Sequence, residues 1–318
     1  MALRLGKFAF VALGGAGGLL VGSLYLAAAA SEGRGGPRAA EPRQAVLVAI
    51  PGGRVQIGDD RAPPDERPQF IYEARPLLMD RTPVTVAQFR RFVQDTGYRT
   101  DAERYGTASV FDPRIGGWLE VEGADWRRPE GPSGAAAADD HPVTQVSWRD
   151  ADAFCRAYGA RLPTEFEWER AARLGQTPEG HVFKLGDSLK GGGRYLANVW
   201  QGPFPLHNSN EDGFRTTAPV GAFGEAPSGL TDMAGNVWEW TASWYRPYDA
   251  AKPADRGIGE RVQRGGSFLC DPTFCQGFRA TARAHATPES ALMHVGFRCV
   301  VEPSKFTARA GRLAQRRT

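Results

Sequence analysis

Histidine, cysteine and methionine are scarce in this chain. Its 318 residues include five histidines, four cysteines and four methionines, and no two histidines form an HxH or HxxxH pair. Histidine-based zinc and iron sites need such ligands close together, so the sequence gives no support to either kind of site. A glycine-rich phosphate loop and a GxSxG motif are also missing. Nucleotide binding and serine-hydrolase chemistry are therefore left without a motif.

An excess of charge of one sign is also missing. The chain has 39 lysines and arginines against 36 acidic residues, a formal net charge of +3, and the two signs are interspersed. A nucleic-acid-binding surface needs a concentrated basic patch, so we expect no nucleic-acid partner. The basic cluster within residues 303–318 is typical of a solvated tail.

The first thirty residues differ in composition from the rest. Arg4 and Lys7 precede an uncharged run from Phe8 to Ala30, and a linker covers residues 31–45. A positive flank followed by an apolar run is typical of an export signal, and this run is also long enough to remain as a membrane anchor. We expect an exported body, periplasmic or otherwise extracytoplasmic, either released or anchored through residues 8–30. Four cysteines in that setting are compatible with two disulfides.

Local signals in residues 46–302 predict one domain with few regular elements. The stretch "VLVAIPGGRVQIGDD" from Val46 predicts a hairpin that turns at residues 51–53. Capping residues and glycines predict three helices, from Thr85 to Gly97, from Ser147 to Gly159 and from Thr164 to Gly175. With 39 glycines and 23 prolines in the chain, we expect long loops over much of the remainder. Loops of such length usually serve a function or hold an ion.

Two of these loop segments are rich in oxygen donors. The donors are Asn198, Asn208, Asn210, Glu211 and Asp212 in the first segment and Asp232, Asn236 and Glu239 in the second. Calcium takes carboxylates together with backbone carbonyls, which irregular loops present freely. Composition alone favours the simpler interpretation, solvated polar loops with local turns.

Two cysteines lie close together in the segment "GGSFLCDPTFCQG". Cys270 and Cys275 are separated by four residues. Two thiolates at this spacing can bind one soft ion such as Cu(I), or they can close a short disulfide. In an exported chain the spacing alone favours the disulfide.

Several long motifs follow one another along the body. They include "TPVTVAQFRRFVQDTGYRTDAE", "HPVTQVSWRDADAFCRAYGARLPTEFEWERAAR", "GLTDMAGNVWEWTASWY", "RGGSFLC" and "GFRCV". In order and content they resemble the formylglycine-generating enzyme (sulfatase-modifying factor) family, from about residue 46 to residue 301. The resemblance implies an α+β fold: an irregular, loop-rich single domain, C-type-lectin-like, with low regular secondary structure.

The resemblance also implies a site and a reaction. Many members of the wider family lack the active-site cysteines, whereas this chain has both, as Cys270 and Cys275. Their thiolates would hold Cu(I), and O2 would be used to oxidise a cysteine, in an unfolded CxPxR segment of a sulfatase-type protein, to formylglycine. Ser267 would position oxygen or water, unless it only satisfies backbone groups in its turn. We expect a monomer.

Structural features follow from the same resemblance. It implies a disulfide between Cys155 and Cys299 and two structural calcium sites. The implied ligands are Asn198, Asp212 and the carbonyls of Val199 and Phe214 for one site, and Asp232, Glu239 and the carbonyls of Gly235 and Val237 for the other.

Four residues near the cysteine pair depart from the family's pattern: Asp271, Phe274, Gly277 and Ala286. The corresponding positions line the substrate groove in the family. An alternative hypothesis is therefore a relative that oxidises a small molecule or a peptide. A third is a non-catalytic, calcium-supported binding module in which the cysteine pair is a permanent disulfide. The retained cysteine pair favours the copper-dependent oxidase over both.

Overall fold

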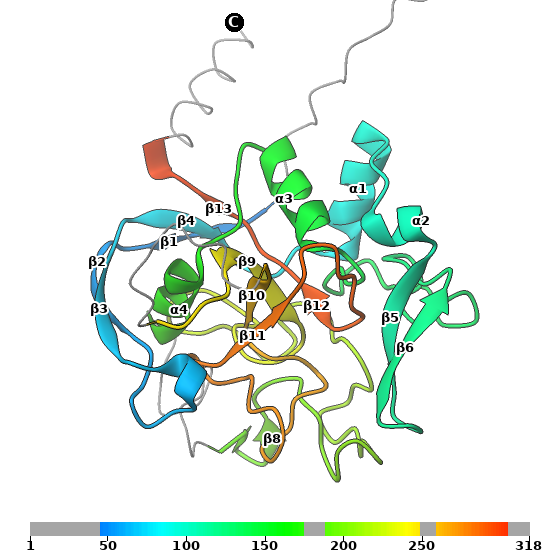
Figure 1. The fold of residues 1–318 in the computed structure, drawn as a ribbon. Helices are drawn as coiled ribbons and strands as arrows, with labels where there is room; N and C mark the ends of the chain where they lie inside the picture. Colours follow the sequence, from blue (N-terminus) through cyan, green and yellow to red (C-terminus); the bar gives the residue numbers. More distant parts are fainter. Residues whose placement is uncertain (1–44, 175–187, 249–258, 305–318) are drawn as a thin grey trace, which may run out of the picture. The chain divides into compact units, whose positions relative to one another are not determined.

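The computed structural model describes residues 45–174, 188–248 and 259–304. Within these ranges short helices and strands alternate with long loops (Figure 1). No helix in the described part of the chain is long and apolar enough to cross a bilayer. The expected export signal, most of the expected linker and most of the expected basic tail lie outside the described residues.

The helices begin at the capping residues expected from the sequence. The helical elements are η1 (Pro64–Glu66), α1 (Val86–Thr96), α2 (Asp101–Tyr105), α3 (Trp148–Ala157) and α4 (Glu165–Leu174). A reciprocal capping box of Thr85 with Gln88 starts α1, and Gly97 in the left-handed conformation ends it. The expected starts of α1, α3 and α4 are confirmed, whereas the short α2 was not expected and the expected end of α4 at Gly175 lies outside the described residues.

The strands of the described residues form two small sheets and three hairpins. The first sheet has the order β1 (Leu47–Ile50), β4 (Leu77–Asp80), β13 (Val300–Val301), and the second has the order β11 (Arg283–Ala286), β10 (Arg261–Arg264), β9 (Trp238–Trp244), β12 (Val295–Gly296). The hairpins are β2 (Gly53–Ile57) with β3 (Phe70–Ala74), β5 (Thr107–Asp112) with β6 (Gly117–Glu122), and β7 (Lys190–Gly191) with β8 (Arg194–Tyr195).

The predicted hairpin of β1 with β2 is wrong. Both strands exist, but β1 pairs with β4 and β2 pairs with β3. The intervening Gly52 packs against Pro76, where an added Cβ would lie 2.9 Å from the proline Cδ. The segment at residues 51–53 therefore leads from one sheet to a separate hairpin instead of folding the two strands together.

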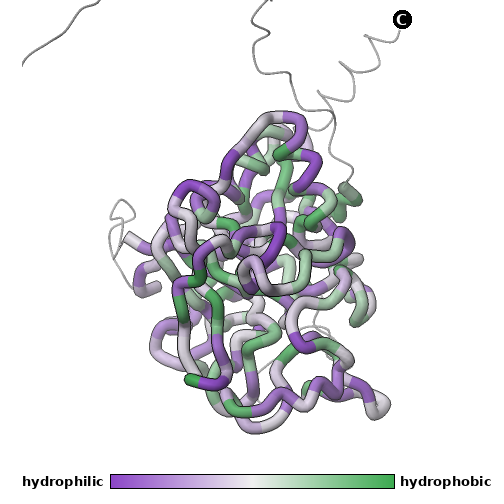
Figure 2. The backbone as a smooth tube through the Cα atoms, turned by 90° about the vertical axis from the view of Figure 1, so that its right-hand side faces the viewer, coloured by the Kyte–Doolittle hydropathy of each residue, from purple (hydrophilic) through white to green (hydrophobic). Residues whose placement is uncertain are grey.

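An aromatic core packs α1 against α3. Phe89 stacks on Phe154 with ring centroids 5.8 Å apart, and Phe297 lies edge-on to Phe154 at 5.3 Å. Cys155 and Cys299 form a disulfide inside this core, with both residues fully buried. Figure 2 shows short hydrophobic stretches interleaved with hydrophilic ones along the tube. The core is therefore assembled from many short segments that are far apart in the sequence.

Candidate functional site

The cysteine pair lies in the loop between β10 and β11. This cysteine loop, residues 265–278, is bounded by buried ion pairs at both ends: Arg264 with Glu169 of α4 at 2.5 Å, and Arg279 with Glu66 of η1 at 2.5 Å. Its two ends also touch, because a Cβ added to Gly266 would lie 2.6 Å from the backbone of residues 277 and 278. Only glycine fits there, so the "GG" of the motif closes the loop on itself.

The structure joins Cys270 to Cys275 by a disulfide, with their Cα atoms 4.9 Å apart. Cys270 is buried, while Cys275 is half-buried and is the more accessible of the two. The pair can bind a soft metal only after a two-electron reduction frees both thiolates. The donor set then suits Cu(I), which prefers thiolate ligands at low coordination number. In the described ranges no three side chains of His, Cys, Asp or Glu come together as a ready metal cage.

Ser267 is fully buried in the turn that precedes the pair. Its hydroxyl oxygen accepts a hydrogen bond from the Leu269 N–H at 3.2 Å, and its carbonyl accepts one from the Cys270 N–H at 2.9 Å. The serine thus fixes the backbone that carries Cys270. These contacts are the ones expected if Ser267 satisfies backbone groups in its turn. Its role in positioning oxygen or water stays a prediction.

The first expected calcium set contains a buried acceptor without a partner. The Asn198 amide nitrogen donates to the Thr216 carbonyl at 2.8 Å, but its Oδ1 atom is buried and accepts no hydrogen bond. The Asp212 carboxylate is tied to the same segment through the N–H groups of Val199 and Phe214, at 3.2 and 2.9 Å. Burial raises the pKa of Asp212. The unpaired Asn198 oxygen is the kind of acceptor that a hard cation takes, whereas the Gln201 amide already donates to the Val199 carbonyl and, at 2.7 Å, to Asp212 Oδ2.

The second expected calcium set is already satisfied by protein groups. Glu239 is fully buried, and its carboxylate accepts hydrogen bonds from the Trp168 indole at 2.7 Å and from the Arg298 guanidinium at 2.7 Å through each oxygen. Asp232 accepts from the Gly221 N–H at 2.7 Å and the Thr231 hydroxyl at 2.6 Å. Because Arg298 neutralises Glu239, these residues fit a calcium ion less well than the first set does.

Backbone hydrogen bonds connect both donor-rich segments to the cysteine loop. The Trp200 N–H donates to the Cys270 carbonyl at 2.9 Å, and the Phe268 N–H donates to the Asn236 carbonyl at 3.0 Å. Asn236 in turn donates its N–H to the Asn198 carbonyl at 2.8 Å. The structure therefore brings the sequence-predicted residues of all three segments into one neighbourhood.

Two aromatic side chains near the pair, Phe204 and Phe111, were not expected from the sequence. Phe274, 76% exposed, stacks on Phe204 at 5.1 Å, and Phe204 stacks on Phe111 at 5.5 Å. Trp238 lies against Cys270, since a Cβ at Gly277 would contact both. Phe204 and Phe111 stand far from the cysteines in sequence, so only the folded chain shows that they belong to this surface.

A pocket of about 230 Å³ adjoins this surface. Its lining includes Leu269 of the cysteine loop, Trp200 and Phe111. The Trp200 indole nitrogen is buried and has no acceptor.

His294 is a half-buried polar residue that the sequence did not mark. Its ring lies 4.8 Å from the Trp118 ring, and its Nδ1 atom has no hydrogen-bond partner. Burial lowers the pKa of His294 to about 3, so the imidazole is neutral at physiological pH. The sequence gave no reason to single out His294, because it forms no HxH or HxxxH pair with another histidine.

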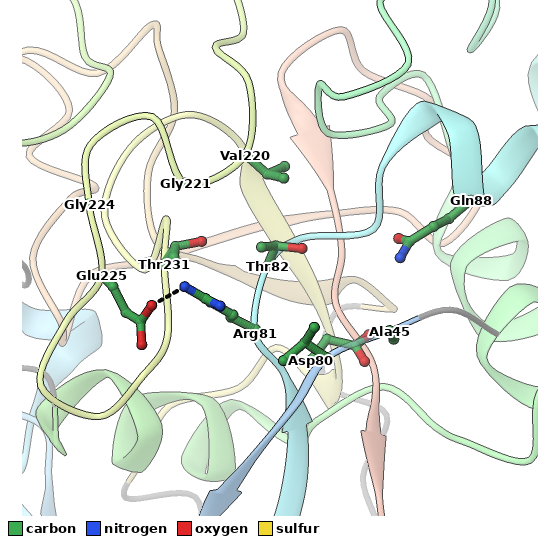
Figure 3. Close-up of a pocket in the computed structure, with 11 residues that line it drawn as sticks. Ala45, Asp80, Arg81, Thr82, Gln88, Val220, Gly221, Gly224, Glu225 and Thr231 are labelled. Carbon is green, nitrogen blue, oxygen red and sulfur yellow. Dashed lines mark hydrogen bonds and ion pairs between the residues drawn. The ribbon is translucent and has the colours of Figure 1, made fainter.

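A larger pocket, of about 430 Å³, lies apart from the cysteine loop. Figure 3 shows the Arg81–Glu225 ion pair at its edge, with Asp80 and Thr82 nearby. None of the cysteine-loop residues lines it. Its size alone therefore does not connect it to the chemistry of the pair.

Known proteins resemble this chain in sequence and in fold. A formylglycine-generating enzyme of Thermomonospora curvata is 43% identical over 286 residues, covering 81% of this chain and 93% of the relative. An inactive C-alpha-formylglycine-generating enzyme 2 of Bos taurus is 41% identical over 276 residues, covering 80% and 87%. Overall identity therefore does not separate relatives named as active from those named as inactive.

The structure of PvdO from Pseudomonas aeruginosa shares the fold, with a TM-score of 0.60 at 23% identity, covering 82% of this chain and 98% of PvdO. The sulfatase-modifying factor enzyme 1-like domain matches residues 35–303. The expected fold class, a loop-rich α+β domain, is thereby confirmed. The match spans most of the chain, and the protein belongs to the formylglycine-generating enzyme (sulfatase-modifying factor) family.

Proposed function

We propose that this protein is a formylglycine-generating oxidase that converts a cysteine in a CxPxR segment of a sulfatase-type protein to Cα-formylglycine. The observation that carries the proposal is the closed cysteine loop, which holds Cys270 and Cys275 at bonding distance in a chain 43% identical to an enzyme of that name. Since relatives named inactive are nearly as similar, the pair matters more to the proposal than overall identity does.

The reaction replaces the thiol-bearing methylene group of the substrate cysteine by an aldehyde. With O2, two electrons and two protons from a thiol reductant, the products are the aldehyde, hydrogen sulfide and water, which balances atoms and charge. Cu(I) held by the thiolates of Cys270 and Cys275 would supply the reactivity toward O2 and the affinity for a third sulfur.

The protein residues around the pair would bind the substrate and exclude water. Half-buried Cys275 faces the accessible side, so the substrate thiol would approach there. Cys270 is buried next to Trp238, and this burial would keep water from its sulfur. The exposed Phe274 would contact the substrate chain by packing against it.

Three further proposals accompany this function. Export with residues 8–30 as signal or anchor would place the body in an oxidising compartment, where the Cys155–Cys299 disulfide forms. A structural calcium ion would bind at Asn198 and Asp212, supported by the unpaired Asn198 oxygen. The enzyme would act as a monomer.

A second candidate differs only in substrate. In this chain Gly277 leaves no space for a side chain beside Trp238, and Phe274 presents an exposed ring. Both features alter the surface that would receive the residues flanking the substrate cysteine. They favour a small thiol or a peptide without the CxPxR pattern as an alternative substrate.

The test uses the full-length chain after reduction. Cu(I) is titrated against a competing chelator, and then O2, a thiol reductant and a CxPxR peptide are added while the peptide is followed by mass. We expect one Cu(I) per chain and loss of about 18 Da in the aldehyde product, since sulfur and two hydrogens are exchanged for one oxygen. Cys270→Ser and Cys275→Ser should abolish both, whereas Ser209→Ala, in an exposed loop, should change neither.

Other outcomes would redirect the proposal. Copper binding without peptide conversion would support the second candidate. No copper binding by the reduced chain would contradict both enzymatic proposals and leave a binding module whose cysteine pair is structural.

A further inference from the structure

The four residues between the cysteines form a capped turn. Oδ1 of Asp271 accepts hydrogen bonds from the N–H groups of Thr273 at 2.7 Å and Phe274 at 3.2 Å, and from the Thr273 hydroxyl. This is the arrangement of a helix N-cap, and Pro272 occupies the first position after it. Proline is favoured there because its fixed φ suits the turn and its missing N–H would have no partner.

Asp271 and Pro272 also hold the end of the turn, through their carbonyl groups. The Asp271 carbonyl accepts from the N–H groups of Cys275 at 3.3 Å and Gln276 at 3.1 Å. The Gln276 side chain donates to the Pro272 carbonyl at 2.7 Å, and Gln276 itself is left-handed, with φ of 48°. Asp271 therefore binds the backbone on both sides of Phe274 and brings Cys275 back over Cys270.

Asp271 is also buried to an unusual degree for a loop carboxylate. Its side chain belongs to a residue only 3% exposed, and its Oδ2 atom has no hydrogen-bond partner. Burying a carboxylate with one unsatisfied oxygen costs free energy of folding, and the hydrogen bonds to its other oxygen must offset that cost. The contacts that it makes all serve the geometry of the turn.

We propose that Asp271 is a positioning residue that holds the Cys275 sulfur against the Cys270 sulfur and thereby sets the equilibrium between the disulfide and dithiol forms of the pair. The proposal rests on the proposed function in one respect, because only the dithiol form can hold a soft metal. The loop is thereby closed by its own cap.

The expected effect follows from the loss of one cap. A fixed turn lowers the entropy cost of bringing the two sulfurs together, so its loss favours the open dithiol. Asp271→Ala should lower the equilibrium constant for disulfide formation about fivefold, the size expected for one lost N-cap. Asp271→Asn should stay close to the wild type, because the amide oxygen can accept the same backbone hydrogen bonds.

The experiment measures the redox equilibrium and needs no activity. The full-length chain is equilibrated in glutathione buffers, where reduction of the pair by two glutathione thiols yields one glutathione disulfide, and each cysteine is then quantified by differential alkylation and mass. Cys155 and Cys299 serve as the internal control for folding, since their buried disulfide should not respond. Asp112→Ala is the matched control, because the Asp112 carboxylate caps a similar turn at Arg114 in the β5–β6 hairpin.

Each outcome decides the proposal. A shift in Asp271→Ala with rescue by Asp271→Asn supports it. Equal shifts in both variants would assign the effect to the charge of the carboxylate and overturn it, as would no shift in Asp271→Ala. If Asp271→Ala loses the Cys155–Cys299 disulfide, Thr273→Val takes its place in the test. This variant removes one of the three donors to Oδ1 and should shift the redox equilibrium of the pair in the same direction by a smaller factor. An unchanged equilibrium would overturn the proposal. A failed peptide-conversion assay leaves these readouts unaffected.

Discussion

The backbone N–H of Trp200 donates a 2.9 Å hydrogen bond to the carbonyl of Cys270. Trp200 follows directly after Asn198 and Val199, which belong to the first expected calcium set. This backbone hydrogen bond therefore links that segment directly to Cys270, without an intervening side chain.

Removal of calcium should destabilise the protein through this segment. We expect chelator to lower the melting temperature of the wild type, because a ligand at about 100 times its dissociation constant contributes about 2.7 kcal/mol. Asn198→Ala should already melt low and should not respond to chelator or to added calcium in scanning calorimetry. Glu211→Gln, in the same loop but paired with Lys190 at the surface, should respond as the wild type does. A calcium response retained in Asn198→Ala would contradict this assignment.

Gly277→Ala should disturb the cysteine pair. The added Cβ would lie 2.4 Å from the Trp238 ring and 2.9 Å from the Cys270 sulfur, so atoms must move. We expect a loss of about 1–3 kcal/mol in the free energy of unfolding, typical of overpacking, together with a changed alkylation rate of reduced Cys270. Gly117→Ala is the control, since its nearest neighbours would lie 3.8 Å away. Equal behaviour of the two variants would mean that the loop has more freedom than the structure indicates.

The stability of the chain should depend on pH through Asp150. Burial raises the pKa of this carboxyl to about 6, so the folded state holds the proton more tightly than the unfolded state. Asp150 therefore costs stability as the pH rises from about 4 through 6, by up to about 3 kcal/mol at about 1.36 kcal/mol per pKa unit. Asp150→Asn removes this titration.

Urea unfolding at several pH values tests the contribution of Asp150. As the pH rises from about 4 through 6, the unfolding free energy of the wild type should fall relative to that of Asp150→Asn. Above that range the difference between the two should stay constant. A difference for Asp150→Asn that does not change with pH would show that its carboxyl titrates alike in both states.

Glu239→Gln should destabilise the protein as the loss of a buried ion pair. Both Glu239 and Arg298 have fully buried side chains, so the neutral amide leaves the guanidinium charge uncompensated. We expect a loss of about 3–5 kcal/mol in urea unfolding. Glu225→Gln, which breaks the partly exposed pair with Arg81, should have a much smaller effect. If Glu239→Gln instead keeps its stability and loses calcium, Glu239 is a calcium ligand and the ion pair is secondary.

Local signals predicted the helices, and long-range packing decided the rest of the fold. The capping residues Thr85, Ser147 and Thr164 act within four positions of the chain, so their helices could be placed from sequence. Strand partners have no such local code. The partner of β1 is β4, which lies well beyond β2 and β3 in the chain, and this is why the hairpin at residues 51–53 was predicted wrongly.

The candidate site shows the same division. The two cysteines and Ser267 stand in one short motif and could be found in the sequence. Phe204 and the hydrogen bond from Trp200 come from a segment far earlier in the chain, and only packing places them beside the cysteine loop. The ion pair at Glu239 also escaped prediction, because an acidic residue in a polar loop gives no sign of whether an arginine or a cation will meet it.

The position of β4 between β1 and β13 has a consequence for biosynthesis. The last strand of the body completes a sheet begun by the first, and the nearby Cys299 closes a covalent link to a residue 144 positions earlier. A nascent chain that still lacks these last residues has the sheet without its third strand and Cys155 without its partner. Folding of the body is therefore completed only once β13 and Cys299 are available to the rest of the domain, and until then the edge of β4 that β13 covers needs protection from other chains.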